Sequence, residues 1–328
     1  MHKPLKNTFR RGFEAGEPKT SGFFKLQKIR TEEKSIFQGI PKIIVILGQT
    51  ATGKSDLAVK IARRVKGEII SADSRQIYKG LDIGTGKITK KEMKGVPHHL
   101  LDVANPKNPA RPPKSGAGGN FTVAEYKKLA DEKIKDILKR KKVPIICGGT
   151  GFYIDAITKG TIFPEVPPNY KLRKQLVTKS AIALFVALKK LDKRRAKNID
   201  PKNKIRLIRA IEIAKALGKV PHLAVKPPSY KFIKIGLYLP SDKLKKKVSK
   251  RVKKMFQDGL LNEIKKLKKA GISNKRLSEL GFEYFNPTYE KVVKGTLQYA
   301  KRQITWFKRD KEIRWFNTSK KLSIDNIP

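Results

Sequence analysis

Short apolar runs alternate with helix-like segments from residue 42 onward. Residues 43–47 are all apolar and lead through a glycine-rich turn into residues 56–62, which continue as a helix. Residues 67–73 and 143–147 have the composition of two further strands, and each ends in a polar or glycine-rich cluster. Strands that alternate with helices in this way predict an α/β fold whose sheet is parallel, with right-handed crossovers.

Three later segments extend this pattern. Residues 122–140 predict a helix, in which Thr122 is the N-cap and Glu125 stands three residues on, the spacing of a capping box. Residues 232–239 predict a strand, and apolar residues spaced by four over 244–256 predict a helix with lysines on its other face.

The chain divides into regions of different character. Residues 1–40 lack periodicity and have no apolar core of a secretory signal, so they are expected to be a basic, disordered tail. Residues 41–160 and 231–328 carry the α/β pattern, and residues 105–120 form a flexible loop by composition. Residues 161–230 are basic, proline-interrupted and mainly helical, which indicates an insertion into the α/β core.

Residues 48–55 form a complete phosphate-binding loop, G-x-x-x-x-G-K-S, between a strand and a helix. Such a loop closes its backbone N–H groups around an oxyanion. The residues expected to bind a polyphosphate are Gly48, Thr50, Ala51, Thr52, Gly53, Lys54 and Ser55. Lys54 would reach the terminal phosphates and the Ser55 hydroxyl would bind Mg²⁺, the one cofactor expected. The alternative is an ordinary strand–turn–helix that happens to be rich in glycine and threonine.

Asp73 and Thr150 follow the second and third predicted strands. Ligands of parallel sheets bind outside the carboxyl ends of the strands. The phosphate-binding loop, Asp73 and Thr150 are therefore expected to converge on one crevice.

Charge and cysteine content narrow the class of protein. The chain has 328 residues with 76 Lys+Arg against 28 Asp+Glu, a formal net charge of +48. This excess favours a polyanionic partner such as nucleic acid, although a genome-wide lysine bias is an alternative source of part of it. A single cysteine excludes a disulfide framework and a cysteine-based zinc site, and it fits a reducing cytoplasm. No apolar run approaches the roughly 18 residues of a membrane helix, so no membrane partner is expected.

Further motifs accompany the loop in a fixed order. They are D-S-R-Q-I-Y at 73–78, L-D-I-G-T-G-K at 81–87, P-H-H-L-L-D at 97–102, G-G-T-G-F-Y at 148–153 and Q-Y-A-K-R-Q-I-T-W-F at 298–307. Together they closely resemble the tRNA dimethylallyltransferase (tRNA isopentenyltransferase) family, bacterial type, from about residue 42 to Trp315. The resemblance implies a P-loop NTPase-like parallel sheet flanked by helices, with residues 161–230 as an inserted tRNA-binding domain. It also implies transfer of a dimethylallyl group from its pyrophosphate to N6 of the adenine 3′-adjacent to the anticodon.

The resemblance assigns catalytic roles to three residues. Asp73 would be the general base at N6, and Thr150 would hold the pyrophosphate or polarise the leaving group. On its residue type alone, Asp73 could equally be a helix N-cap or an outer ligand of magnesium, and Thr150 a turn residue. Arg173 would be a second pyrophosphate clamp, although residues 167–170 replace a more usual acidic stretch there.

The resemblance also implies tRNA contacts. Asp73, Ser74, Arg75 and Gln76 would touch the target base, Arg206 and Arg209 would lie on a tRNA-contact helix, and Lys301, Arg302 and Gln303 on a second tRNA-facing element. The alternative for the last group is a basic amphipathic helix covering the sheet, with Trp306 in the core. Leu297 and Ser241 stand where the family commonly has arginine.

The remaining expectations concern partners and competing functions. The anticodon stem-loop of tRNA and dimethylallyl pyrophosphate are the expected substrates, and we expect a cytoplasmic monomer. His98 and His99 are expected to be structural loop residues and Cys147 a buried core residue. The alternative functions are isopentenyl transfer to a free adenine nucleotide, ATP-dependent phosphorylation of a small molecule, and RNA binding without catalysis.

Overall fold

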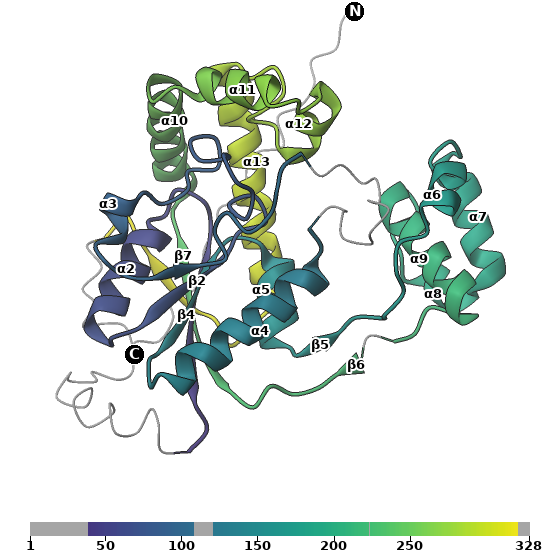
Figure 1. The fold of residues 1–328 in the computed structure, drawn as a ribbon, viewed down its shortest axis with the longest axis horizontal. Helices are drawn as coiled ribbons and strands as arrows, with labels where there is room; N and C mark the ends of the chain where they lie inside the picture. Colours follow the sequence, from purple (N-terminus) through teal and green to yellow (C-terminus); the bar gives the residue numbers. More distant parts are fainter. Residues whose placement is uncertain (1–38, 108–120, 223, 321–328) are drawn as a thin grey trace, which may run out of the picture.

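The computed structural model describes residues 39–107, 121–222 and 224–320 (Figure 1). The expected tail at 1–38 and most of the predicted flexible loop, residues 108–120, lie outside the described residues. The centre of the molecule is a six-stranded sheet in the order β3-β2-β4-β1-β7-β8, and every pairing in it is parallel. Its strands are β1 (Lys42–Gly48), β2 (Glu68–Ala72), β3 (His98–His99), β4 (Pro144–Gly148), β7 (Lys231–Tyr238) and β8 (Arg314–Asn317).

The sheet confirms the predicted parallel α/β class. The four strands expected from the apolar runs are present as β1, β2, β4 and β7. The two edge strands were not predicted. His98 and His99, expected in a loop, form β3 beside β2, and Arg314–Asn317 form β8. Two residues are too few for any periodicity, and β8 is half-exposed, so neither carries an apolar run.

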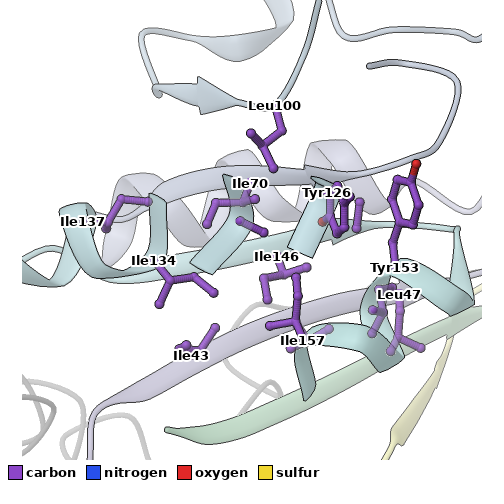
Figure 2. Packing of buried hydrophobic residues seen from close by; sticks show 14 of the residues in the cluster. Ile43, Leu47, Ile70, Leu100, Tyr126, Ile134, Ile137, Ile146, Tyr153 and Ile157 are labelled. Atoms are coloured by element: carbon purple, nitrogen blue, oxygen red, sulfur yellow. The ribbon is translucent and has the colours of Figure 1, made fainter. Parts of the chain in front are cut away.

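Helices bury both faces of the sheet. On one face, Ile43, Val45 and Leu47 pack with α4 (Val123–Lys139) and α5 (Gly151–Thr158), as Figure 2 shows for part of this cluster. On the other face, Ile46 packs against α2 (Lys54–Arg64). Burial on both faces explains why these strands are continuous apolar runs rather than alternating ones.

The predicted capping box at the start of α4 is present. Thr122 Oγ1 accepts the Glu125 N–H at 3.2 Å, and Glu125 Oε2 accepts the Thr122 N–H at 2.6 Å. The ring of Tyr126 stacks on that of Tyr153, with centroids 3.9 Å apart. This stack joins α4 to α5, next to the glycine-rich turn that ends β4 (Figure 2).

A second helical layer stands beyond the carboxyl ends of the strands (Figure 1). It comprises α10 (Ser241–Gln257), α11 (Leu260–Lys269), α12 (Asn274–Leu280) and the first part of α13 (Tyr289–Phe307), whereas the short α3 (Lys90–Met93) lies beside α2. Leu244, Val248 and Val252 of α10 are buried, which confirms the predicted apolar stripe.

The segment expected to be an insertion builds a helical body of its own. The antiparallel pair of β5 (Thr161–Ile162) and β6 (Ala224–Val225), which was not predicted, forms its neck. Between them lie α6 (Tyr170–Leu176), α7 (Ala181–Leu191), α8 (Lys193–Lys197) and α9 (Lys204–Leu217). These helices share an apolar cluster that includes Leu184, Leu188 and Leu207, and Figure 1 shows them set apart from the sheet. Within the described residues, no helix is both long and apolar enough to cross a membrane.

Candidate active site

The phosphate-binding loop leaves β1 through a backbone that only glycine fits. Gly48 has φ +125°, and a Cβ there would lie 2.1 Å from the Leu237 carbonyl oxygen of the neighbouring strand. The Gln49 carbonyl then accepts hydrogen bonds from Thr52 Oγ1 at 2.7 Å and from Lys54 Nζ at 2.6 Å. The loop is therefore closed around its own carbonyl, and it ends at the N-terminus of α2.

Lys54 is half-buried within this loop. Burial, aided by the Arg251 guanidinium, lowers the pKa of its ammonium group to about 8, although Cys147 and the Asp73 carboxylate act in the opposite direction. A cation that is costly to bury gains from a bound anion, because the anion stabilises its charged form. Ser55, the next residue, is exposed.

Thr150 binds the residues on both sides of Asp73, because β2 and β4 are neighbours in the sheet. The Ser74 N–H donates to Thr150 Oγ1 at 2.9 Å, and the Thr150 N–H donates to the Ala72 carbonyl at 3.1 Å. The Thr150 hydroxyl also donates to Ser74 Oγ at 3.3 Å. The residues that end these two strands thus form one hydrogen-bonded group.

The two oxygens of the Asp73 carboxylate have different surroundings. Its Oδ1 accepts the N–H groups of Arg75 at 2.9 Å and Gln76 at 3.4 Å, so Asp73 caps a turn rather than the helix that the N-cap alternative required. Its Oδ2 receives no hydrogen bond from the part of the chain that the structure describes. The carboxylate acts on the pKa values of both Lys54 and Arg251, so it lies beside the phosphate-binding loop. The cap fixes the carboxylate while one oxygen stays available.

Sequence reasoning missed Arg251, which reaches the loop from α10. Its Nη1 donates to Thr50 Oγ1 at 3.5 Å and its Nη2 donates to the Thr85 carbonyl at 3.1 Å. Burial lowers the pKa of this guanidinium, and the carboxylates of Asp73 and Glu283 oppose that shift. Arg251 is one basic residue among the many lysines of α10, so only its position beside buried Val252 could have singled it out.

Gln303 of α13 faces into the site rather than outward. It is 4% exposed; its Oε1 accepts the Thr50 N–H at 2.7 Å and its Nε2 donates to the Gly149 carbonyl at 3.0 Å. Tyr299 OH donates to the same carbonyl at 3.4 Å. Gln303 therefore ties the phosphate-binding loop to the turn after β4, whereas Lys301 and Arg302 are exposed on the outer side of α13.

The two residues after Ser74 are held by segments that lie between the helices. Arg75 Nη1 pairs with Glu283 Oε2 at 2.5 Å, and its guanidinium lies 5.2 Å from the Phe282 ring centroid. Gln76 Nε2 donates to the carbonyls of Thr85 at 3.5 Å and Gly86 at 3.4 Å. Both side chains are thus fixed along one wall of the crevice.

The structure does not bring Arg173 to the loop. Its Nε and Nη2 both lie 2.7 Å from oxygens of Glu212, a carboxylate buried in the insertion, and α6 lies apart from the strand ends in Figure 1. Arg209 also contacts Glu212, at 3.3 Å, and donates to the Val166 carbonyl at 2.8 Å. Arg206 is exposed. The position of Arg173 in the sequence after the glycine-rich turn could not reveal that it belongs to the insertion, away from the phosphate-binding loop.

Three other expectations concern packing. Cys147 is buried, as expected, and burial raises the pKa of its thiol to about 12. Trp306 is half-buried; its Nε1 donates to Asp155 Oδ2 at 3.2 Å and its ring closes over Gly151. Leu297 packs against the apolar cluster of α10 and α13, and Ser241 begins α10.

The described part of the protein offers few oxygen donors for Mg²⁺, so a bound phosphate compound would have to supply most of the ligands of the ion. Among the described residues, no group of three or more His, Cys, Asp or Glu side chains could hold a metal ion. Mg²⁺ favours oxygen donors and keeps few protein ligands when it binds phosphates. The exposed Ser55 hydroxyl is such a donor, and it stands directly after the loop.

Comparison with known proteins agrees with this geometry. The family model for IPP transferase matches residues 76–310. The tRNA dimethylallyltransferase of Halothermothrix orenii is 39% identical over 307 residues, covering 87% of this chain and 90% of the relative. That of Caldanaerobacter subterraneus is 41% identical over 298 residues, covering 84% and 91%.

Solved structures give the same result. The tRNA isopentenylpyrophosphate transferase of Bacillus halodurans superposes with a TM-score of 0.59 at 34% identity, covering 84% of this chain and 90% of that one. A eukaryotic dimethylallyltransferase acting on tRNA has a TM-score of 0.69 at 24% identity, over 84% of this chain and 74% of that one, and supports the fold alone. With the matched family model and these relatives, the chain belongs to the IPP transferase family, whose members here are named tRNA dimethylallyltransferases.

Proposed function

We propose that this protein transfers a dimethylallyl group from dimethylallyl pyrophosphate to N6 of the adenine 3′-adjacent to the anticodon of tRNA. One observation carries the proposal. The phosphate-binding loop, Asp73 and Thr150 lie at the carboxyl ends of β1, β2 and β4, three neighbouring strands of one sheet. An anion-binding loop beside an available carboxylate suits a reaction that expels pyrophosphate and removes a proton.

The loop side of the crevice would bind the pyrophosphate. Lys54, Arg251 and the N-terminus of α2 place positive charge where the leaving oxygen becomes negative. Cationic and N–H donors that are already in place need no rearrangement as this charge develops. Loop residues Gly48 to Gly53 would contribute through their backbone, except that the Thr50 N–H is already taken by Gln303.

The carboxylate side would handle the adenine. The N6 nitrogen attacks the allylic carbon, the new C–N bond forms, and the C–O bond breaks with its electron pair leaving on pyrophosphate. N6 must then lose a proton, and Asp73 Oδ2 is positioned to accept it while Oδ1 stays capped. The Thr150 hydroxyl, beside Ser74, would orient the leaving group.

Mg²⁺ is part of the proposal. Ser55 would hold it through the hydroxyl, and most other ligands would be pyrophosphate oxygens. When bound, the ion would neutralise part of the charge of the leaving group. The residues of this chain would still supply the orientation and the proton acceptor.

The tRNA would lie across the second helical layer and the insertion. Lys301, Arg302 and Arg206 expose their charges to solvent there, and cations of this kind contact phosphates. The target adenine would leave its stack to reach Asp73, Ser74, Arg75 and Gln76, as enzymes that modify bases require. We further propose that the protein acts as a monomer in the cytoplasm.

The test is an assay with unmodified tRNA, Mg²⁺ and dimethylallyl pyrophosphate, followed by mass analysis of the digested nucleosides. Isopentenyladenosine from tRNA and none from AMP is the expected result. Product from AMP alone would favour transfer to a free nucleotide. Movement of labelled phosphate from ATP to a small molecule would instead identify a kinase.

A further inference from the structure

A buried carboxylate outside the crevice gathers three successive backbone amides. Glu263 of α11 is 8% exposed. Its Oε2 accepts the N–H groups of Asp82 at 3.0 Å and Ile83 at 2.7 Å, and its Oε1 accepts that of Gly84 at 3.1 Å. Tyr284 OH donates to Oε1 as well, at 3.0 Å. Four donors on one carboxylate fix residues 82–84 to α11.

The segment held in this way ends against the Arg251 guanidinium. The next residue, Thr85, offers its carbonyl to Arg251 Nη2 at 3.1 Å and to Gln76 Nε2 at 3.5 Å. A Cβ on Gly86 would lie 2.0 Å from Arg251 Nη2, so the backbone approaches the guanidinium as closely as glycine allows. Arg251 in turn reaches the loop at Thr50 Oγ1.

We propose that Glu263 is a positioning residue that aims Arg251 at the pyrophosphate. A carboxylate that accepts several N–H groups holds them more firmly than neutral acceptors do. Without it, the N–H groups of Asp82, Ile83 and Gly84 lose their acceptor, and the segment must move to find new partners for them. The Thr85 carbonyl would move with the segment, and Arg251 would lose the acceptor that orients it. This inference rests on the proposed role of Arg251 in binding pyrophosphate.

A purely structural role for Glu263 predicts a different result. Glu263 is buried and its Oε1 accepts hydrogen bonds from Tyr284 OH and the Gly84 N–H, so removing the carboxylate must cost some stability in either case. If Glu263 only stabilised the fold, its substitution would reduce pyrophosphate affinity equally with and without Arg251. If Glu263 acts through Arg251, its effect on pyrophosphate affinity disappears once Arg251 is removed.

The test is a double-mutant cycle with Glu263→Gln and Arg251→Met, read by titration calorimetry with inorganic pyrophosphate and Mg²⁺. Glutamine keeps the size but turns one oxygen into a donor that faces other donors. We expect Glu263→Gln to weaken pyrophosphate binding about tenfold in the parent protein and less than twofold in the Arg251→Met background. Affinity for tRNA should stay within a few-fold in both.

Two further variants complete the design. Glu132→Gln makes the same change at an exposed position of α4 and should leave pyrophosphate affinity unchanged. If Glu263→Gln does not fold, Tyr284→Phe, which removes one of the four donors, replaces it in the cycle with a smaller effect of the same pattern. Equal losses in both backgrounds, or no loss of affinity in the folded variant, would overturn the inference. The double-mutant cycle measures binding and not transfer. A protein that binds pyrophosphate but modifies no tRNA would therefore refute the proposed function, and the cycle would still test the role of Glu263.

Discussion

At the scale of single residues, Asp73 combines a structural and a chemical position. The roles of helix N-cap and general base were alternatives on sequence alone. The structure shows a cap on a turn instead, and this cap is compatible with the proposed base, because it uses Oδ1 only. The turn after β2 would thus preorganise Asp73 for the proposed proton transfer.

Asp73→Ala should abolish dimethylallyl transfer, because the proton of N6 loses its acceptor. Affinity for tRNA should stay within a few-fold, since most binding energy comes from phosphate contacts elsewhere. Single-turnover assays and filter binding measure the two quantities. Asp73→Asn keeps the Oδ1 cap and serves as the matched control for folding; a large loss of tRNA binding in it would refute the assignment of Asp73 as base.

Lys54 gives the site a pH dependence. Its pKa is lowered to about 8, chiefly by burial, so it is half-charged near pH 8, mostly charged below and mostly neutral above that value. Pyrophosphate binding to the free protein should weaken above pH 8, approaching tenfold per pH unit at most. Calorimetry between pH 6.5 and 9.5 measures this.

Lys54→Ala is the control: it should keep the pH dependence that comes from pyrophosphate itself and lack the additional weakening above pH 8. It should lose more affinity for pyrophosphate than for tRNA. An unchanged pH profile in Lys54→Ala would assign the titration to another group.

Local motifs could predict one part of the site and not the other. The loop, Asp73 and Thr150 follow strand ends, so motif and strand order sufficed. Arg251 and Glu263 act across more than 100 positions of sequence, from helices that pack over the site only in the folded chain. Gln303 belongs to a recognised motif and was expected to face tRNA, but its bond to the Thr50 N–H was not predicted. Arg173 shows the converse. Its position in the sequence suggested a pyrophosphate clamp, whereas its guanidinium pairs with Glu212.

At the scale of elements, buried strands were predictable and short ones were not. β1, β2, β4 and β7 carry apolar residues on both faces, whereas β3, β5 and β6 have two residues each. A strand of two residues is defined by its partner rather than by its own sequence. The capping box of α4 was predictable because it is encoded within four residues.

One ion cluster joins three of these elements at the far end of the sheet. Glu68 at the start of β2 is 2% exposed and accepts hydrogen bonds from Lys142 at 2.8 Å, from Arg140, and from His99 at 2.7 Å in the tautomer that donates. The Arg140 guanidinium, helped by Lys142 and His99, holds the pKa of the Glu68 carboxyl far below its usual value. The cluster thus links β2 and β3 to the turn that precedes β4.

Glu68→Gln should lower the free energy of unfolding by about 1–3 kcal/mol at pH 7, less than for a fully buried pair because Arg140 and Lys142 are partly exposed. A depressed carboxyl pKa contributes stability above the unfolded value of 4.5, and this contribution is lost as the pH falls below it. Urea unfolding at pH 7 and pH 3.5 measures both. The difference between Glu68→Gln and the parent should shrink at pH 3.5; an equal difference at both pH values would contradict the account.

At the scale of the whole molecule, charge and shape act together. A net charge of +48 is spread over a sheet core and a helical insertion that carries its own apolar cluster. The crevice holds few of these charges: Lys54 and Arg251 lie at the phosphate-binding loop, and Arg75 on its wall is paired with Glu283. The exposed remainder fits a partner much larger than dimethylallyl pyrophosphate.

Affinity for tRNA should therefore fall steeply with salt. Each phosphate contact that is lost should reduce the slope of log affinity against log salt concentration by about one unit. Arg206→Ala in the insertion and Arg302→Ala on α13 should each show this reduction. Arg173→Ala, whose guanidinium is paired with Glu212, should keep the parent slope if it still folds. Identical slopes for all four proteins would refute the proposed tRNA path.

The most direct test maps the product within the tRNA. The protein, Mg²⁺, dimethylallyl pyrophosphate and unmodified tRNA are incubated, and ribonuclease fragments are then sequenced by mass spectrometry. The account predicts one added dimethylallyl group, on the adenine 3′-adjacent to the anticodon, with the parent protein and none with Asp73→Ala. Modification at other adenines, or an active Asp73→Ala, would contradict it.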